Sequence, residues 1–261
     1  MAALMRLLLF VGGITMAEFE NIEFVYCDRA VAKRVCESRH YMKTYPQGAK
    51  VNVALMDNGK LVGICVFGYS SQTDKKIAKI AYSVEREQYL EMQRLWISDD
   101  YGHNTESYVL SRILKKLQKD YDLQVVVTHA GGCKDDCGIV YQASGWLYFG
   151  AQPSSDFYLT AAGEYKNIIA PMRFGRVDAK GKTPQQVGEE LFGPGEIIDA
   201  HRYFYAYPLN KGMRRRLTKL QLPFPKSSAI FRRDQQWVTQ GGSAGAAPTG
   251  SIPVASTKVH S

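Results

Sequence analysis

The sequence predicts an α/β fold built on a mixed, mostly antiparallel sheet with flanking helices. A β-hairpin is indicated where Asp57-Asn58-Gly59-Lys60 joins two apolar runs, because Asn-Gly in such a place is the strongest short-range hairpin signal. Segments with the apolar spacing of helices separate the strands. The β-branched run at residues 123–128 is typical of a central strand that is buried on both faces.

The first half of the chain alternates strands and helices. Apolar residues at every second position predict a strand over residues 21–27. Asp28 can cap a helix that runs to about His40. We expect the buried face of this helix to hold Ala30, Val31, Val35 and Cys36. The strands predicted after it lie at residues 51–56, 61–67 and 88–97.

The second half predicts further helices and strands around the central strand. Asn104 is the expected N-cap of a helix that ends near Lys119. We expect this helix to bury Val109, Ile113, Leu114 and Leu117. A short helix at 139–144, stopped by Gly145, and a strand at 146–149 follow. Within residues 156–199 we expect two possible strands and one helix, which begins at Thr183-Pro184 and ends at Gly193. The last predicted strand is at 201–209.

Composition limits the class of protein. The chain has 261 residues, of which 45% are hydrophobic and 22% charged, and this is ample for a globular core. No apolar run approaches the ~18 residues of a membrane-spanning helix, so we expect no membrane partner. Five cysteines are an odd and sparse set, which argues against a disulfide framework and predicts a reducing, cytoplasmic environment.

Positive charge is concentrated toward the end of the chain. The formal net charge is +8, and nine basic residues with no acidic residue lie between positions 201 and 233. Such a local patch indicates a nucleic-acid partner better than a diffuse basic composition does. A solvated helix face is the alternative. The residues expected to contact the phosphates of double-stranded DNA are Arg202, Lys211, Arg214, Arg215, Arg216 and Lys219.

The domain organisation follows from shifts in composition. We expect residues 1–15 to be a leader or a start-site artefact, because MAALMRLLLFVGG is similar to a short signal peptide and Met16 offers a second start. A cleaved export signal and a first buried strand are the alternatives. One domain is expected over residues 16–209, with an insertion at about 151–200. A basic DNA-binding extension over 210–233 and a flexible tail of small residues over 234–261 complete the chain.

The segment from Gly138 to Trp146, GIVYQASGW, carries a resemblance. It resembles the helix-to-strand step of the GCN5-related N-acetyltransferase superfamily. In that superfamily the preceding strand splays from its neighbour to hold an acyl-CoA thioester, and the tyrosine of the step protonates the leaving thiolate. The resemblance assigns this role to Tyr141, and a phenol that is neutral at pH 7 can donate such a proton. Packing of the helix on the sheet is the alternative role.

The chain departs from that superfamily at the loop that usually binds the CoA pyrophosphate. A Gly-rich loop at a helix N-terminus favours anions, whereas residues 100–107 read DYGHNTES, without the glycine pattern and with acidic residues nearby. The departure indicates that the usual donor is bound differently or is not used.

Several short matches, taken in their order and spacing, resemble the Mom family of phage DNA-modification proteins. They are His40-Tyr41, residues 61–68, Arg94-Leu95 leading to residues 104–107, the step at 138–150, and HRYFY at 201–205. The resemblance implies conversion of adenine in DNA to N6-methylcarbamoyl-adenine, which protects phage DNA from restriction in the cytoplasm of the bacterial host. It also implies iron, while acetyl-CoA or a related acyl donor stays open.

Chemistry at adenine N6 suits residues of the matched segments. The amine is inaccessible inside a duplex, so we expect the base to be extruded and held against aromatic rings. Candidate substrate-binding residues are Tyr41, Tyr69, Arg94, Tyr101 and Asn104. Besides Tyr141, the candidate catalytic residues are Ser107, which could hold an acyl oxygen or a phosphate, and His40. Helix-start chemistry for Ser107 and a helix-end role for His40 are the alternatives.

Metal ligands are indicated only weakly by spacing. The ligand-type residues near the matched segments are His40, His103, His129, Cys133, Asp135, Asp136 and Cys137. A C-x₃-C spacing without a second pair is a weak zinc pattern. Iron favours histidine and carboxylate ligands. The resemblance implies a histidine and an aspartate in the loop before Tyr141, where this chain has Asp136 and Cys137. We therefore expect Asp136 as a ligand, with His40 as the histidine. A solvated turn with one structural thiol is the alternative.

Two other functions stay open on the sequence. The first is an ordinary acyl-CoA-dependent N-acetyltransferase of a protein or a small amine, for which the basic segment is incidental. The second is a non-catalytic DNA-binding protein on the same fold, for which Tyr141 is dispensable.

Overall fold

The computed structural model describes most of the chain between residues 21 and 239. The described ranges are 21–69, 84–102, 104–131, 137–173, 177–225, 229–232 and 235–239. The expected leader, His103, Asp136 and most of the expected tail lie outside these ranges.

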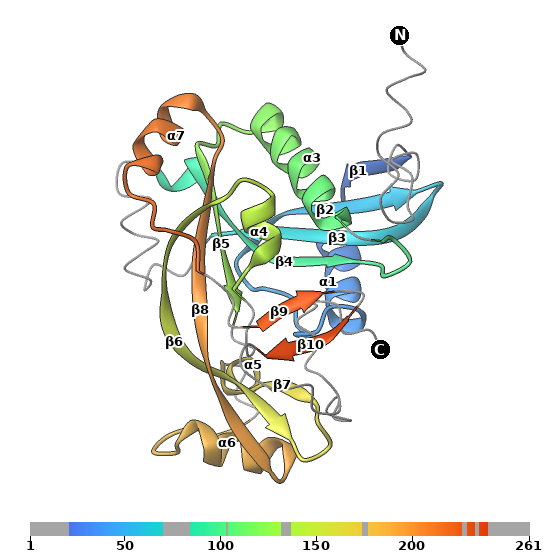
Figure 1. Cartoon of the computed structure of the whole chain (residues 1–261). Helices are drawn as coiled ribbons and strands as arrows, with labels where there is room; N and C mark the ends of the chain where they lie inside the picture. The colour runs from blue at the N-terminus through green and yellow to red at the C-terminus, as the bar shows by residue number, and fades with distance from the viewer. Residues whose placement is uncertain are drawn as a thin grey trace.

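An eight-stranded sheet forms the centre of the molecule (Figure 1). Its strands are β1 (Ile22–Tyr26), β2 (Ala49–Asp57), β3 (Lys60–Gly68), β4 (Tyr89–Ile97), β5 (Val125–Gly131), β6 (Leu147–Thr160), β7 (Tyr165–Asn167) and β8 (Gly195–Pro208). Their order in the sheet is β1-β2-β3-β4-β5-β8-β6-β7. Only β4 and β5 pair in parallel; the other pairs in this sheet are antiparallel. The predicted fold class, a mixed and mostly antiparallel sheet with flanking helices, is confirmed.

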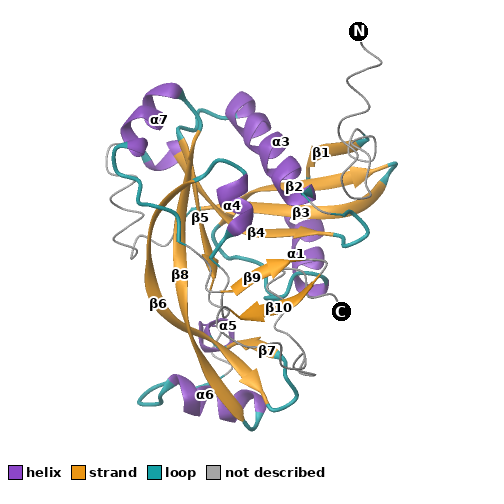
Figure 2. Cartoon of the chain, in the orientation of Figure 1, coloured by secondary structure: helices purple, strands orange, loops and turns teal. Residues whose placement is uncertain are grey.

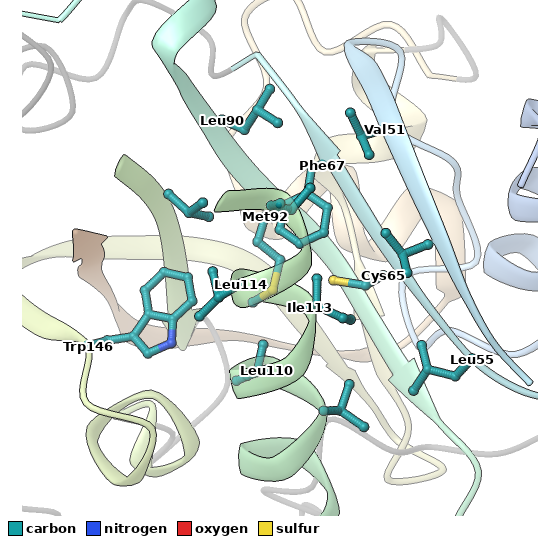
Figure 3. Close-up of a cluster of buried hydrophobic side chains, with 14 of the residues drawn as sticks. Val51, Leu55, Cys65, Phe67, Leu90, Met92, Leu110, Ile113, Leu114 and Trp146 are labelled. Atoms are coloured by element: carbon teal, nitrogen blue, oxygen red, sulfur yellow. The ribbon is translucent and has the colours of Figure 1, made fainter. Parts of the chain in front are cut away.

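Helices cover both faces of the sheet. They are α1 (Arg29–Ser38), α3 (Thr105–Asp120), α4 (Ile139–Ala143), α5 (Ile169–Arg173), α6 (Pro184–Phe192) and α7 (Lys211–Thr218), with a 3-10 turn at Arg86–Gln88. On the α3 face, Leu110, Ile113 and Leu114 pack against apolar side chains of β3 and β4 (Figure 3). Successive strand residues point to opposite faces of the sheet. Ala54 on β2 and Ile64 on β3 therefore point away from α3 and pack with α1 in a second core. Among the described residues, no helix is long and apolar enough to cross a membrane.

Local sequence signals explain most of these boundaries. Asp28 caps α1 by accepting a hydrogen bond from the Val31 amide (2.8 Å). Asn58 and Gly59 both have positive φ (48° and 79°), as a two-residue hairpin turn requires. Thr183 and Gln186 form a reciprocal capping box at α6, with a proline in its first turn. The predicted Asp28 cap, the predicted hairpin and the predicted helix start at Thr183-Pro184 are confirmed.

Two details of the helices differ from the sequence predictions. The buried side chains of α1 are Ala32, Val35 and Cys36, while Ala30 is exposed, because the 3.6-residue period carries the buried face one position further along. Asn104 precedes α3, but it has a left-handed backbone (φ 69°) and its side chain makes no capping hydrogen bond. The predicted N-cap position of Asn104 is confirmed, but its side chain does not satisfy the free N–H groups of α3.

The β6–β8 hairpin is much longer than predicted. Each strand has 14 residues, and Figure 2 shows the pair extending beyond the rest of the sheet, toward α6. The predicted strand at 146–149 is only the beginning of β6. The distal part of this hairpin carries β7, α5 and α6, and it has its own small core around Tyr158, Ile168, Val177 and Val187. The expected insertion is thus continuous with the main sheet.

Part of the expected flexible tail is structured. Gln235–Thr239 forms β10 and pairs with β9 (Ala229–Arg232) in a separate two-stranded sheet. Both segments contain β-branched and aromatic residues, which favour strands. The rest of the tail lies outside the described residues.

Candidate active site

A break in strand pairing defines the site. β4 and β5 pair over only four residue pairs, from Tyr89–Val125 to Met92–Thr128. Beyond this point β4 stays paired with β3 and β5 stays paired with β8, as far as Ile97 and Gly131 respectively. The two strands therefore separate in the middle of the sheet, and a cavity lies where they do so.

The walls of the cavity come from five parts of the fold. They are the segment after α1, the second half of β4, the first turn of α3, the end of β5, and α4. The lining residues are His40, Tyr41, Met92, Gln93, Arg94, Leu95, Glu106, Thr128, His129, Ala130, Gly131, Gly138, Val140 and Tyr141. Four predicted site residues, His40, Tyr41, Arg94 and Tyr141, are thus brought together from distant parts of the sequence.

The cavity connects the two faces of the sheet. Tyr141 packs with the core beneath α3. Arg94 lies on the other side, near the buried Cys36 of α1. Burial raises the pKa of the Cys36 thiol, and the charge of Arg94 partly opposes this rise. His129 also lies on that side, where its ring meets the ring of Phe204 edge-on, with the centroids 4.6 Å apart. A ligand in the cavity can therefore meet groups from both faces.

Arg94 brings a buried positive charge to the cavity. Its guanidinium donates to the Thr44 carbonyl (3.2 Å), the Thr44 hydroxyl (3.1 Å) and the Gln93 carbonyl (2.7 Å). Burial lowers its pKa, although the nearby Tyr41, Cys36 and Glu91 oppose the shift. Within the described part of the chain it forms no ion pair with a carboxylate. A buried cation bonded only to neutral acceptors is costly, so this site favours a ligand with a carbonyl oxygen or negative charge.

His40 is held as a neutral ring. Its Nδ1 accepts a hydrogen bond from the Met42 amide (3.1 Å), and its ring stacks on Tyr41 with centroids 4.4 Å apart. Burial, and then the charges of Arg94 and Lys43, hold its pKa well below the usual value. Because Nδ1 is the acceptor, the ring proton is on Nε2. His40 therefore offers a hydrogen-bond donor beside the aromatic surface of Tyr41.

The described residues do not fit the predicted iron site. Among them, no group of three histidine, cysteine, aspartate or glutamate residues is close enough to hold a metal ion. A histidine that binds a metal usually donates its other ring N–H, whereas Nδ1 of His40 accepts. His40 is therefore a poor ligand in this arrangement, and Asp136 lies outside the described residues. We derive no step through a metal.

Tyr141 stands on a well-packed base. Its ring contacts Trp146 edge-on (centroids 5.3 Å apart) and Tyr205 at a tilt (5.4 Å). The hydroxyl of Tyr205 donates to the Cys137 carbonyl and accepts from Gln142 Nε2. Gly138, with φ 77°, starts α4, and a Cβ at this position would come within 2.7 Å of Ala130. Glycine thus allows α4 to approach the sheet closely enough to bring Tyr141 to the cavity.

The other predicted substrate residues lie away from the cavity. Tyr69 packs under the cations of Arg86 and Lys50, 4.8 and 5.4 Å from its ring centroid. Tyr101 donates to Asp57, and burial followed by this contact raises its pKa to about 12. Asn104 is exposed before α3. None of the three lines the cavity.

Ser107 shows the helix-start chemistry. Its hydroxyl donates to the Asn104 carbonyl (3.1 Å), and it does not line the cavity. Glu106, its neighbour on the first turn of α3, does so instead. A carboxylate at this position disfavours the phosphate that a helix N-terminus otherwise attracts.

The basic residues near the end of the chain form an exposed helical face. Asn210 caps α7 through the Met213 amide (2.8 Å), and Met213 and Leu217 are buried against the sheet. This packing leaves the basic side chains Lys211, Arg214, Arg215 and Lys219 exposed and Arg216 half-buried. Arg202 differs from them, because it forms an ion pair with Asp156 on β6.

The basic helix and the cavity lie toward opposite ends of β5. α7 follows the strand end where Pro208 pairs with Val125, and the cavity lies at the end where Arg202 pairs with Gly131. At 3.3 Å per residue, these ends are about 20 Å apart.

Comparison with known proteins decides the family. The sequence profile of the Mom protein family matches residues 21–226. The chain belongs to this family. The matched region contains every described residue of the cavity and the whole of α7.

Individual proteins are similar to the chain in sequence or in structure. The chain is 26% identical to the methylcarbamoylase Mom of Escherichia phage Mu over 210 residues, which cover 79% of this chain and 83% of that protein. Among solved structures, the ribosomal-protein-S18-alanine N-acetyltransferase of Escherichia coli matches with a TM-score of 0.40 and 10% identity, over 72% of this chain and 94% of the other. The putative acetyltransferase YncA of Salmonella typhimurium, with acetyl-CoA, matches with a TM-score of 0.40 and 12% identity, over 74% and 96%.

Proposed function

We propose that this member of the Mom family transfers a methylcarbamoyl group to N6 of adenine in DNA. The observation that carries the proposal is the cavity between β4 and β5, which joins Tyr141 to an aromatic and cationic surface. The relative from phage Mu is a methylcarbamoylase, and the same group is the one we assign here. Protection of phage DNA from restriction in the host cytoplasm is the expected consequence.

The face of the cavity formed by His40, Tyr41 and Arg94 suits an extruded base. The stacked rings of His40 and Tyr41 offer a flat surface for a purine. The Nε2–H of His40 can donate to a ring nitrogen. Extrusion costs a few kcal/mol of lost base stacking, and contacts of this kind offset that cost.

Tyr141 is placed to act on the donor. It lines the cavity from the α3 face, opposite the surface proposed for the base. A positioned phenol can protonate the leaving group of an acyl donor as the bond to adenine forms. Arg94 has five N–H groups, and its hydrogen bonds to described residues use three of them. The other two can donate to the carbonyl oxygen of the transferred group.

The exposed basic side chains of α7 are the proposed contact with the DNA backbone. Phosphate contacts give affinity and register on the duplex without reading the sequence. The distance of about 20 Å between the two ends of β5 lets one duplex lie on α7 and present a base to the cavity.

An ordinary acyl-CoA-dependent N-acetyltransferase is the second candidate. Tyr141 and the separated strands favour it equally, but Glu106 stands on the helix turn where a CoA pyrophosphate would lie, and this disfavours the usual mode of binding. Transfer from acetyl-CoA to a protein or a small amine also gives no role to α7.

Nucleoside mass spectrometry of plasmid DNA from expressing cells tests the proposal. We expect deoxyadenosine heavier by one methylcarbamoyl group, and resistance of the plasmid to restriction enzymes whose sites contain adenine. Cells that express the Tyr141→Phe variant at the same level are the control. Unmodified deoxyadenosine from cells with abundant folded protein, together with acetylation of a free amine by acetyl-CoA, would favour the ordinary acetyltransferase.

A further inference from the structure

A hydrogen-bonded glutamate–histidine pair bridges the two separating strands. Glu91 is on β4 and His129 on β5, at the point where the pairing of these strands ends. Glu91 Oε1 lies 2.8 Å from His129 Nδ1, and the side chains are only 15% and 19% exposed. His129 is one of the residues that line the cavity. The pair therefore places a titratable group in the wall of the proposed site.

The geometry fixes both the orientation and the tautomer of the ring. The carboxylate accepts from Nδ1–H, so the nitrogen that can accept a proton in the neutral ring is Nε2. Phe204 holds the ring from the side, with centroids 4.6 Å apart. A histidine that is oriented in this way by a carboxylate is the common arrangement of a general base, because the carboxylate stabilises the imidazolium that forms.

The proposed reaction needs a proton acceptor on this side of the sheet. The lone pair of adenine N6 is delocalised into the purine ring, so the amine becomes a good nucleophile only as its proton leaves. His40 cannot accept that proton through Nδ1, which already accepts from Met42, or through Nε2, which carries the ring proton. Arg94 is a cation, and Tyr141 is the proposed acid.

We propose that His129, oriented by Glu91, is the general base of the reaction. This role rests on the proposed function. As the N6–H bond breaks, its proton passes to Nε2 of His129 and its electron pair forms the bond from N6 to the acyl carbon of a thioester donor. The bond from that carbon to sulfur breaks with its electron pair, and the thiolate takes the proton of Tyr141. The imidazolium of His129 then pairs with the Glu91 carboxylate.

The pH dependence of the reaction follows from the groups that surround this pair. Glu91 contacts His129 directly, and Arg94 follows Glu91 on the same strand. The other titratable groups that line the cavity are His40, Tyr41, Glu106 and Tyr141. Activity should rise with pH as His129 loses its proton, and removal of the Glu91 charge should move this rise to lower pH.

The variants His129→Gln and Glu91→Gln test the pair. Glu106→Gln tests the other carboxylate of the cavity. His201→Gln, at an exposed position of β8, is the matched histidine control. Plasmid DNA is incubated with each protein in bacterial extract between pH 5.5 and 9, and modified deoxyadenosine is counted by mass spectrometry. His129→Gln should lower the rate roughly 10²- to 10⁴-fold, the usual worth of a positioned base. Glu91→Gln should lower it by a smaller factor and shift the pH profile to lower pH. His201→Gln should match the wild type.

Two further measurements separate a catalytic role from a structural one. Imidazole added to His129→Ala should restore part of the rate, which a loss of packing would not allow. An NMR titration of the His129 ring should give a lower pKa in Glu91→Gln than in the wild type. Wild-type rates and profiles in folded Glu91→Gln and His129→Gln, or loss of the pH limb in Glu106→Gln alone, would overturn the assignment. A wild type that makes no modified deoxyadenosine would overturn the proposed function together with it.

Discussion

At the scale of single residues, the cavity places the proposed acid and the proposed base on opposite faces of the sheet. Tyr141 reaches it from α4, on the α3 face, and His129 reaches it from the other face, where its ring contacts Phe204. Two proton-transfer groups on the same side would compete for one proton, whereas groups on opposite sides can serve the donor and the acceptor separately. The break between β4 and β5 is what makes this arrangement possible, because a continuous sheet would keep the two faces apart.

The first prediction at this scale concerns the hydroxyl of Tyr141. Tyr141→Phe removes one oxygen and keeps the ring contacts with Trp146 and Tyr205, so the melting temperature should stay within a few degrees of the wild type. The rate of DNA modification should fall by about 10²- to 10⁴-fold if the phenol is the acid. A folded variant with the wild-type rate would leave Tyr141 only its packing role.

A second prediction concerns the stability of the protein in acid. The folded state holds the pKa of His40 well below the ordinary value, chiefly by burial, so below about pH 6.5 the unfolded chain binds a proton that the folded chain does not. Stability therefore falls as the pH is lowered, by up to about 1.4 kcal/mol per pH unit from this group.

Chemical denaturation of the wild type and His40→Asn between pH 7 and pH 5 measures this effect. Asparagine can still accept from the Met42 amide but does not titrate, so its stability should fall less steeply with acid. Equal slopes for the two proteins would show that His40 does not contribute to the acid sensitivity.

At the scale of elements, α7 combines a buried apolar face with an exposed basic one. Replacing Arg214, Arg215 and Arg216 with alanine keeps Met213 and Leu217 in the core, so the helix should stay folded. DNA affinity should fall for all sequences, and the slope of log K against log salt should shrink by up to about 0.9 for each lost phosphate contact.

Filter-binding titrations at several salt concentrations measure both quantities. The matched control replaces Arg29, Lys33 and Arg34 on α1 with alanine. These substitutions remove the same charge from another helix. If both triple variants lose affinity equally, net charge rather than α7 determines binding. If the α7 variant keeps the wild-type affinity and slope, the DNA lies elsewhere.

Elements whose signals are local could be predicted from the sequence. The Asn58-Gly59 turn, the Asp28 cap and the Thr183–Gln186 capping box are each set by residues within four positions of one another. The lengths of β6 and β8 could not be predicted in this way. Pro153 and the polar residues after it interrupt the apolar alternation of β6, and the strand persists because β8 pairs with it along its length.

The site shows the same limit at longer range. His40, Arg94 and Tyr141 could be proposed because their short motifs resemble those of a family. The contact of Glu91 with His129 depends on the register of two parallel strands that are connected through α3. Nothing within either segment indicates that register. Tyr69 and Tyr101 are predicted at the site because an aromatic ring can stack on an extruded adenine. Chemical suitability does not determine where a residue lies in the fold.

At the scale of the whole molecule, the described residues of the distal half of the β6–β8 hairpin contact the site near its base. The ring centroids of Phe157 and Tyr41 are 6.1 Å apart. Ile198 and Ala200 belong to the same small hydrophobic cluster. Beyond them, β7, α5 and α6 enclose their own core. The arrangement indicates that the inner hairpin supports the cavity and that the outer part can be removed.

The register of the hairpin defines where to remove it. Phe157 pairs directly with Ile198, so residues 158–197 can be replaced by Asn-Gly, a two-residue turn that suits antiparallel strands. We expect a folded protein in which Tyr41 keeps its contact with Phe157 and the rate of DNA modification stays within about tenfold of the wild type, because an independent core outside the site makes little contribution to it. Circular dichroism and mass spectrometry of modified DNA measure the two outcomes. A shortened chain that folds and binds DNA but modifies none would show that the distal part contributes to the reaction, and a chain that does not fold would show that its core supports the whole sheet.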